Sequence, residues 1–71
     1  MARYDLIGVI NHMGTINGGH YVAYVNMSVH PENEEEFDWF CFNDTRRYKL
    51  SRNQVEYNND AYILFYKLRE G

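Results

Sequence analysis

The sequence predicts a mostly β fold, an antiparallel sheet with one short helical turn. Aromatic residues make up 17% of the 71 residues, and they gather with Val and Ile in a few short segments. Side chains of these types suit a pleated, half-buried surface. The intervening stretches are rich in Gly, Asn, Asp and Glu, which is typical of turns and loops. A chain of this length provides one domain at most.

Four segments are expected to be strands: residues 4–11, 19–26, 37–42 and 61–68. The last of them is almost continuously apolar, which is typical of a strand covered on both faces. Ser51 and Gln54 have the spacing of a capping box, in which each side chain accepts a hydrogen bond from the other residue's backbone. One short helical turn is therefore expected after Ser51.

The segments between the strands differ in their chemistry. Residues 13–19 contain three glycines, which permit positive φ angles and the close approach of another backbone. Residues 30–36 form the one acidic run and are expected to be a solvated hairpin loop, with a docking element as the less favoured alternative. Residues 58–60 are expected to turn the chain into the last strand.

Composition argues against several classes of function. The formal net charge is −3 and the basic residues cluster only at 46–49, so no nucleic-acid partner is expected. The apolar runs are far shorter than the roughly 20 residues that span a bilayer, so no membrane partner is expected either. A lone cysteine without an export signal favours a reducing compartment, the cytoplasm or the nucleus.

One cysteine and three histidines are the candidates for a metal site. The spacings of His12, His20, His30 and Cys41 match no zinc signature, so neither a metal nor another cofactor is expected. Cys41 lies between two phenylalanines inside a predicted strand, with no neighbouring cation that would favour a thiolate. It is expected to be a small core residue and not a nucleophile.

Two positions at strand ends carry candidate catalytic groups. His20 begins a strand directly after the glycine-rich loop, a placement that suits a general base, although it also suits a histidine that packs at a sheet edge. Asn43 and Asp44 follow an aromatic strand, where one of them can orient a histidine on a neighbouring strand. An Asx-turn is the simpler interpretation of the same pair. The residues alone leave both alternatives open.

Four stretches, in this order, resemble the C-terminal portion of the catalytic domain of the ubiquitin-specific proteases. They are YDLIGVINHMG at 4–14, GGHYVAY at 18–24, WFCFND at 39–44 and AYILFY at 61–66. Together they cover nearly the whole chain except the acidic loop. The resemblance implies that the sheet is part of an α+β papain-like cysteine protease fold. It also implies hydrolysis of the isopeptide or peptide bond after the C-terminal glycine of ubiquitin.

The resemblance assigns expected roles to the residues at the strand ends. His20 matches the general base, which takes the proton of the nucleophilic cysteine and later protonates the leaving amine. Asn43 matches the residue that orients this histidine. Asp44 looks like the second acidic residue that assists in some members of the family.

The resemblance also implies a surface that binds the tail of ubiquitin. The glycine-rich loop is similar to a family loop that flanks the entering tail, and the next aromatic residue is similar to one that walls the channel. The expected contact residues are Met13, Gly14, Gly18, Gly19 and Tyr21. The implied partners are ubiquitin, ubiquitinated proteins and the remainder of the catalytic domain.

One part of the family pattern does not match. The nucleophilic cysteine of the family lies in a segment near the start of its catalytic domain, and Cys41 is not in a matching motif. Residues 1–71 are therefore expected to be a C-terminal fragment of the catalytic domain that is inactive alone. The alternative is a non-catalytic ubiquitin-binding or scaffolding module that reuses the protease sheet.

Overall fold

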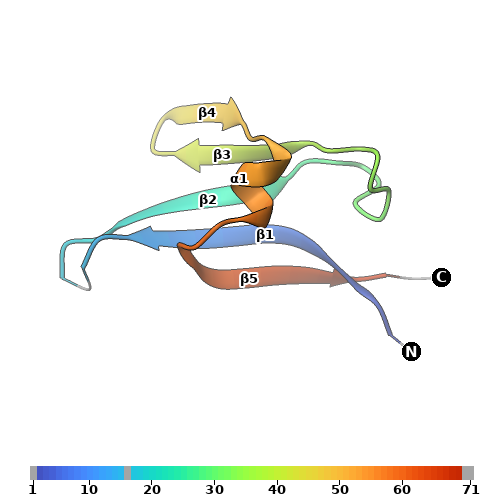
Figure 1. The fold of residues 1–71 in the computed structure, drawn as a ribbon, viewed down its shortest axis with the longest axis horizontal. Coiled ribbons are helices and arrows are strands. Elements are labelled where there is room, and N and C mark those ends of the chain that lie inside the picture. Colours follow the sequence, from blue (N-terminus) through green and yellow to red (C-terminus); the bar gives the residue numbers. More distant parts are fainter. Residues whose placement is uncertain (1, 16, 70–71) are drawn as a thin grey trace.

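A computed structural model describes residues 2–15 and 17–69 of the chain. Their elements, in order, are β1 (Tyr4–Met13), β2 (His20–Asn26), β3 (Trp39–Asn43), β4 (Arg46–Lys49), α1 (Arg52–Glu56) and β5 (Ala61–Leu68). The strands form one sheet in the order β4-β3-β2-β1-β5, and each neighbouring pair is antiparallel (Figure 1). The expected antiparallel sheet with one short helix is confirmed.

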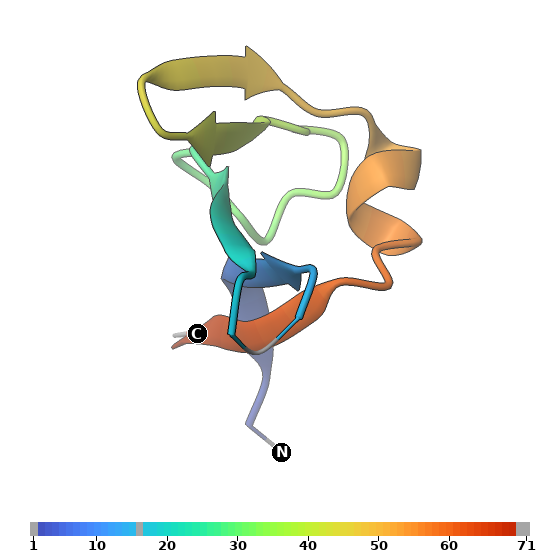
Figure 2. The ribbon, with the colours of Figure 1, turned by 90° about the vertical axis from the view of Figure 1, so that its left-hand side faces the viewer.

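The connections explain the strand order. Strands β1 to β4 follow one another in the sheet as they do in the chain, whereas β5 returns after α1 to pair with the other side of β1 (Figures 1 and 2). Because β2 and β3 run in opposite directions, the first residue of β2 and the last residue of β3 lie at the same end of the sheet. The turn between β1 and β2 projects from that end (Figure 1).

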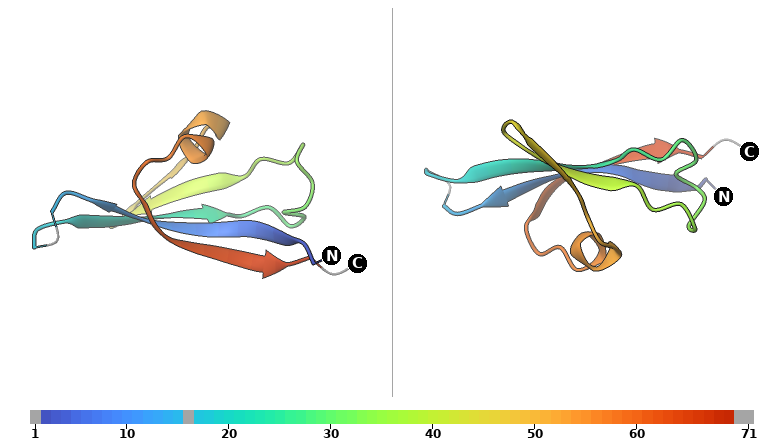
Figure 3. Two further views of the ribbon diagram at one scale, coloured as in Figure 1. Left: turned by 60° about the horizontal axis from the view of Figure 1, so that its bottom comes forward. Right: turned by 90° about the horizontal axis from the view of Figure 1, so that it is seen from above.

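The core lies on the face of the sheet that α1 covers (Figure 3). The side chains of paired residues in neighbouring antiparallel strands point to the same face, and the register pairs Val9 with Tyr24 and Tyr24 with Cys41. Val55 of α1 packs against the buried cluster on this face. The cluster consists of Val9, Val22, Trp39, Cys41 and Leu50.

Helix α1 begins at the capping box that the sequence predicts. The N–H of Gln54 donates to Ser51 Oγ at 3.3 Å, and the N–H of Ser51 donates to Gln54 Oε1 at 2.8 Å. These two bonds satisfy backbone donors that a helix start leaves free. Within residues 2–15 and 17–69, no helix has the length and apolar character needed to cross a membrane.

Strand β4 is a difference from the sequence prediction. Residues 46–49 were expected only as a basic cluster, yet they pair with β3 as the edge of the sheet. All four side chains are exposed, so the segment lacks the apolar alternation by which a strand is recognised. Asp44, with a φ of 54°, reverses the chain between β3 and β4.

The expectation that the last strand is covered on both faces is wrong for the described residues. All eight side chains of β5 are exposed, including Leu64 at 47% and Phe65 at 49%. The physical reason is that the core under α1 includes no residue of β5, which lies at the second edge of the sheet with β1 as its one neighbour. Its apolar run therefore forms an open surface.

The acidic loop is exposed and partly ordered by its own bonds. Backbone hydrogen bonds from Asn33 to His30 and from Glu36 to Asn33 close two consecutive turns. The guanidinium of Arg52, in α1, donates to the carbonyl of Glu34 at 3.0 Å. The loop is thus solvated, as expected, and one bond ties it to the helix.

Candidate functional site

The two candidate catalytic side chains meet at one end of the sheet. His20 is the first residue of β2 and Asn43 is the last residue of β3. The register of these strands, with Ala23 opposite Phe42, brings their ends together. His20 Nε2 lies 2.7 Å from Asn43 Oδ1, a normal hydrogen-bond distance between residues 23 positions apart in the sequence.

This hydrogen bond determines which ring nitrogen of His20 remains free. An amide oxygen can only accept a hydrogen bond, so Nε2 carries the proton and donates it to Asn43 Oδ1. In the neutral ring, Nδ1 then has an unshared electron pair. His20 can therefore accept a proton at Nδ1 while Asn43 holds the ring in orientation.

A pocket of about 340 Å³ opens beside this bond. It is lined by His20, Asn43, Asp44, Thr45 and Arg46. Asp44 lies in the turn after β3 in the left-handed backbone region, which Asp tolerates better than most residues. Thr45 and Arg46 were not predicted as members of the site, because the sequence does not indicate that the chain turns back into β4 at this point.

The glycine-rich turn lies next to His20. Met13 pairs with His20 across β1 and β2, so the turn begins and ends at the site. Gly14 has a φ of +99°, a conformation that side chains rarely permit, and the N–H of Gly18 donates to the carbonyl of Thr15 at 3.3 Å. The structure thus places the expected contact residues Met13, Gly14, Gly18 and Gly19 beside His20. Ile16, within the expected loop, lies outside the described residues.

Tyr21 lies on the opposite face of β2 from His20, because successive side chains of a strand alternate between faces. Its ring is 55% exposed and contacts the ring of His12, with 4.7 Å between the ring centroids. Tyr62, at the start of β5, completes the group at 6.0 Å from His12 and 6.2 Å from Tyr21. The sequence analysis did not predict this aromatic group. Tyr62 is far from His12 and Tyr21 in the sequence, so no local pattern indicates that the three rings meet.

Cys41 is confirmed as a core residue. Its side chain is fully buried and lies between Tyr24 and Tyr48 of the neighbouring strands. Hydrogen bonding with Cys41 raises the pKa of Tyr48, and burial raises the pKa of Tyr24. A thiol in this position has no access to a substrate.

No metal site is formed by the part of the chain that the structure describes. Among residues 2–15 and 17–69, no three His, Cys, Asp or Glu side chains gather in an arrangement that could hold a metal ion. His20 is bonded to an amide, and His30 lies in the exposed acidic loop beside Glu32.

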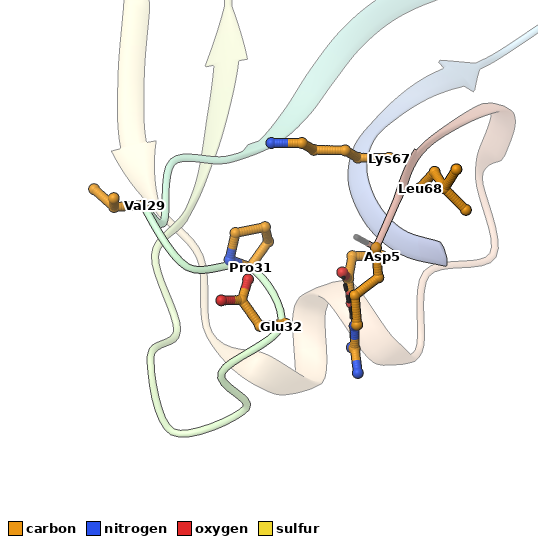
Figure 4. A pocket seen from close by; sticks show the side chains of 7 residues that line it. Asp5, Val29, Pro31, Glu32, Lys67 and Leu68 are labelled. Atoms are coloured by element: carbon orange, nitrogen blue, oxygen red, sulfur yellow. Dashed lines mark hydrogen bonds and ion pairs between the residues drawn. The ribbon is translucent and has the colours of Figure 1, made fainter. Parts of the chain in front are cut away.

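A second, larger pocket of about 410 Å³ lies at the other end of the sheet. Figure 4 shows Pro31 and Glu32 on one side of it and Asp5 and Lys67 on the other. The carboxylate of Asp5 is paired with Arg69, and this hydrogen bond lowers the pKa of Asp5. Size alone does not identify the site here, since the histidine and its amide partner lie at the opposite end.

Comparisons with known proteins give one consistent result. The family model described as ubiquitin carboxyl-terminal hydrolase matches residues 1–66. Ubiquitin carboxyl-terminal hydrolase 8 of Saccharomyces cerevisiae is 39% identical over 67 residues, which are 94% of this chain and 12% of that protein. Ubiquitin carboxyl-terminal hydrolase 31 of Homo sapiens is 46% identical over 66 residues, which are 93% of this chain and 4% of that protein.

Solved structures agree with the sequence comparisons. The Ubp8-Sgf11-Sgf73-Sus1 SAGA DUB module contains a chain that matches 97% of this one, with a TM-score of 0.79 and 38% identity. A related module bound to ubiquitin aldehyde matches with the same TM-score and identity. The match covers 14% and 13% of those two chains, so the 71 residues correspond to a small part of a much larger protein in each case.

Proposed function

Since the chain belongs to the ubiquitin carboxyl-terminal hydrolase family, we propose that it supplies the general base of a ubiquitin-specific cysteine protease and the residue that orients this base. The reaction is hydrolysis of the isopeptide or peptide bond after the C-terminal glycine of ubiquitin. The hydrogen bond of 2.7 Å between His20 and Asn43 is the observation that carries the proposal. Residues 1–71 are the C-terminal part of the catalytic domain in this proposal.

The proposed role of His20 follows from its free ring nitrogen. Nδ1 takes the proton of a cysteine thiol, and the resulting thiolate attacks the carbonyl carbon of the terminal glycine. The protonated ring then gives its proton to the departing lysine amine. Water hydrolyses the remaining thioester with His20 again acting as the base, while Asn43 Oδ1 holds Nε2–H throughout.

The proposed nucleophile lies outside these residues. Cys41 is enclosed in the core, and a buried thiol cannot reach the carbonyl of a peptide tail. The chain spans only 12% of its yeast relative, so the proposal assigns the nucleophile to another part of the whole protein. We expect the isolated chain to be inactive for this reason.

The proposed tail-binding surface is the glycine-rich turn beside His20. Its glycines leave room for the backbone of the narrow end of the tail, where side chains would clash. One of the matched structures is a module bound to ubiquitin aldehyde, which supports ubiquitin as the ligand of this chain also. Tyr21, exposed on the other face of β2, is the proposed aromatic wall where the tail approaches this turn. Asp44 is proposed to assist Asn43 from the pocket that they share.

The proposed partner of the open sheet is the remainder of the catalytic domain. The described residues leave β5 exposed, although its sequence is nearly all apolar. A surface of this kind marks a protein contact. The buried, unpaired cysteine also fits the proposed location in the cytoplasm or nucleus, where thiols stay reduced.

The test uses the full-length protein and a ubiquitin–fluorophore substrate. His20→Ala is expected to lower kcat by ~10⁴-fold or more, the order found when a triad base is removed. Asn43→Ala is expected to lower kcat by a smaller factor, because Asp44 lies in the same pocket. The double variant Asn43→Ala/Asp44→Ala is expected to lower kcat more than Asn43→Ala does. Retention of most activity by His20→Ala would falsify the proposal.

A further inference from the structure

We propose that His12 is a positioning residue for His20, an inference that rests on the proposed function. The ring of His12 fills the space beside Gly19 where any other residue would have a side chain, and so it holds the backbone that carries His20. The two histidines lie on opposite faces of the sheet. His12 thus acts on His20 through the backbone of β2, from the face of the sheet that also carries Tyr21.

The close packing of His12 on Gly19 is the first observation. A Cβ atom placed on Gly19 would lie 2.6 Å from Cδ2 of His12, 2.7 Å from Cε1 and closer still to Nε2. Cβ atoms in proteins essentially never approach other atoms within 3.0 Å. The pair is therefore complementary in shape, with a ring on one strand and a glycine on the next. The other glycines of the turn have no ring against them.

The second observation is that aromatic packing, without a hydrogen bond at Nε2, holds the ring of His12. Its Nε2 is buried without a hydrogen-bond partner, an arrangement that costs free energy. The rings of Tyr21 and Tyr62 lie against it with centroids 4.7 and 6.0 Å away. The backbone N–H of His12 donates to the carbonyl of Asp60 at 3.0 Å, which anchors the strand under the ring.

These contacts bear on His20 because of strand alternation. Gly19 and Tyr21 are its two neighbours, and both face the ring of His12, whereas the His20 side chain faces Asn43. The ring therefore blocks movement of residues 19–21 away from the pocket. Without it, glycine at position 19 would leave the start of β2 free to take other backbone angles. A small shift there would lengthen the bond between His20 and Asn43.

The test is a double-mutant cycle in the full-length protein with a ubiquitin–fluorophore substrate. Gly19→Ala is expected to lower kcat by ~100-fold, the cost of displacing a catalytic group by about 1 Å, and this loss of kcat is the effect that the cycle tests. In the His12→Ala background the added methyl group has room, so the double variant is expected to be at least ~10-fold more active than Gly19→Ala, a coupling typical of residues in contact. A direct clash of the methyl group with the ubiquitin tail would instead raise KM and would persist without His12.

Two variants serve as matched controls. Gly8→Ala adds the same methyl group to β1, where its nearest neighbours, atoms of Phe65, lie at an ordinary 3.6 Å. His30→Ala removes a histidine from the exposed loop. Both are expected to keep kcat and KM unchanged.

The inference is overturned if Gly19→Ala is as active as the wild type, or equally impaired with and without His12. If Gly19→Ala does not fold, the melting temperature of the double variant decides: recovery supports the inference and no recovery overturns it. An active His20→Ala protein would refute the proposed function itself. An inactive His20→Ala protein with additive effects of Gly19→Ala and His12→Ala would refute only the role of His12.

Discussion

His20 and Cys41 occupy opposite environments, although both belong to strands of the same sheet. His20 lies at a strand end, next to a pocket and bonded to an amide that can orient it. Cys41 lies in the middle of β3 with no exposed surface. The chemistry of each side chain therefore follows from its place in the sheet, because the start of β2 opens to a pocket and the centre of β3 lies in the buried core.

Cys41→Ala provides a direct test at the residue scale. In the full-length protein we expect this variant to keep the proposed ubiquitin hydrolase activity, because the thiol does not reach the site. Its free energy of unfolding is expected to fall by about 1–3 kcal/mol, as is usual for truncation of a core side chain. Denaturant titration measures this loss.

Reaction with a thiol reagent gives an independent check. Cys41 is expected to be modified only in denaturant, with the unfolded protein as the positive control. Rapid labelling of Cys41 in the folded protein, together with loss of activity on Cys41→Ala, would contradict its assignment to the core.

At the scale of elements, short polar contacts fix how β1, β5 and α1 lie relative to one another. Asn58, in the segment between α1 and β5, donates to the buried side-chain oxygen of Asn11 in β1. At the far end, Arg69 bonds the carboxylate of Asp5 through its side chain and the carbonyl of Arg3 through its backbone. These contacts hold the edge strand although its side chains are exposed.

Removal of Arg69 tests the contact between the ends of β1 and β5. Hydrogen bonding to Arg69 lowers the pKa of Asp5 from its ordinary value of 3.8, so the pair adds stability above that pH. This contribution is lost as the pH falls through the lowered pKa of the folded protein. Arg69→Gln is therefore expected to raise the pKa of Asp5, which an NMR titration of the carboxyl carbon measures.

The stability difference between Arg69→Gln and the wild type is expected at neutral pH and is expected to vanish well below pH 3.8. Arg47→Gln, at the opposite edge of the sheet, is the control and is expected to leave the Asp5 titration unchanged. A pKa of Asp5 that stays low in Arg69→Gln would contradict the assigned cause.

At the scale of the whole molecule, the sheet is covered on part of one face. Helix α1 packs over the cluster centred on Val9, Val22 and Cys41, while the other face and both edges stay open (Figure 3). A chain of about this length buries only about 60% of its unfolded surface, which makes an independent domain marginal. The exposed strand β5 is consistent with a sheet that needs a covering layer.

The isolated chain is accordingly expected to self-associate. Sedimentation velocity should show a mean mass that rises with concentration, because exposed apolar strands at a sheet edge pair with one another. Phe65→Lys, which puts a charge on this strand, is expected to reduce the association. Val29→Lys, at a more exposed position in a loop, is expected to change it little. A chain that remains monomeric at all concentrations would contradict this prediction.

Local sequence patterns determined most of the strands, the start of the helix and the position of Cys41 inside a strand of the core. Alternating aromatic and β-branched residues, glycine turns and the spacing of Ser51 and Gln54 each act within a few residues, so they can be recognised from the sequence. Strand β4 has no such pattern, because an exposed edge strand does not need apolar residues on either face. The exposure of β5 could not be predicted either, since an apolar segment does not indicate whether the layer that covers it belongs to the same 71 residues.

The identity of the candidate site residues was available from the sequence, whereas their geometry was not. Motifs placed His20 and Asn43 at strand ends, but only the antiparallel register brought them within 2.7 Å and left Nδ1 as the free nitrogen. The fit of His12 on Gly19 and the approach of Tyr62 also depend on strand pairing. The physical reason is that a chain's local preferences act over a few residues, while contacts across a sheet join residues whose proximity is created only by folding.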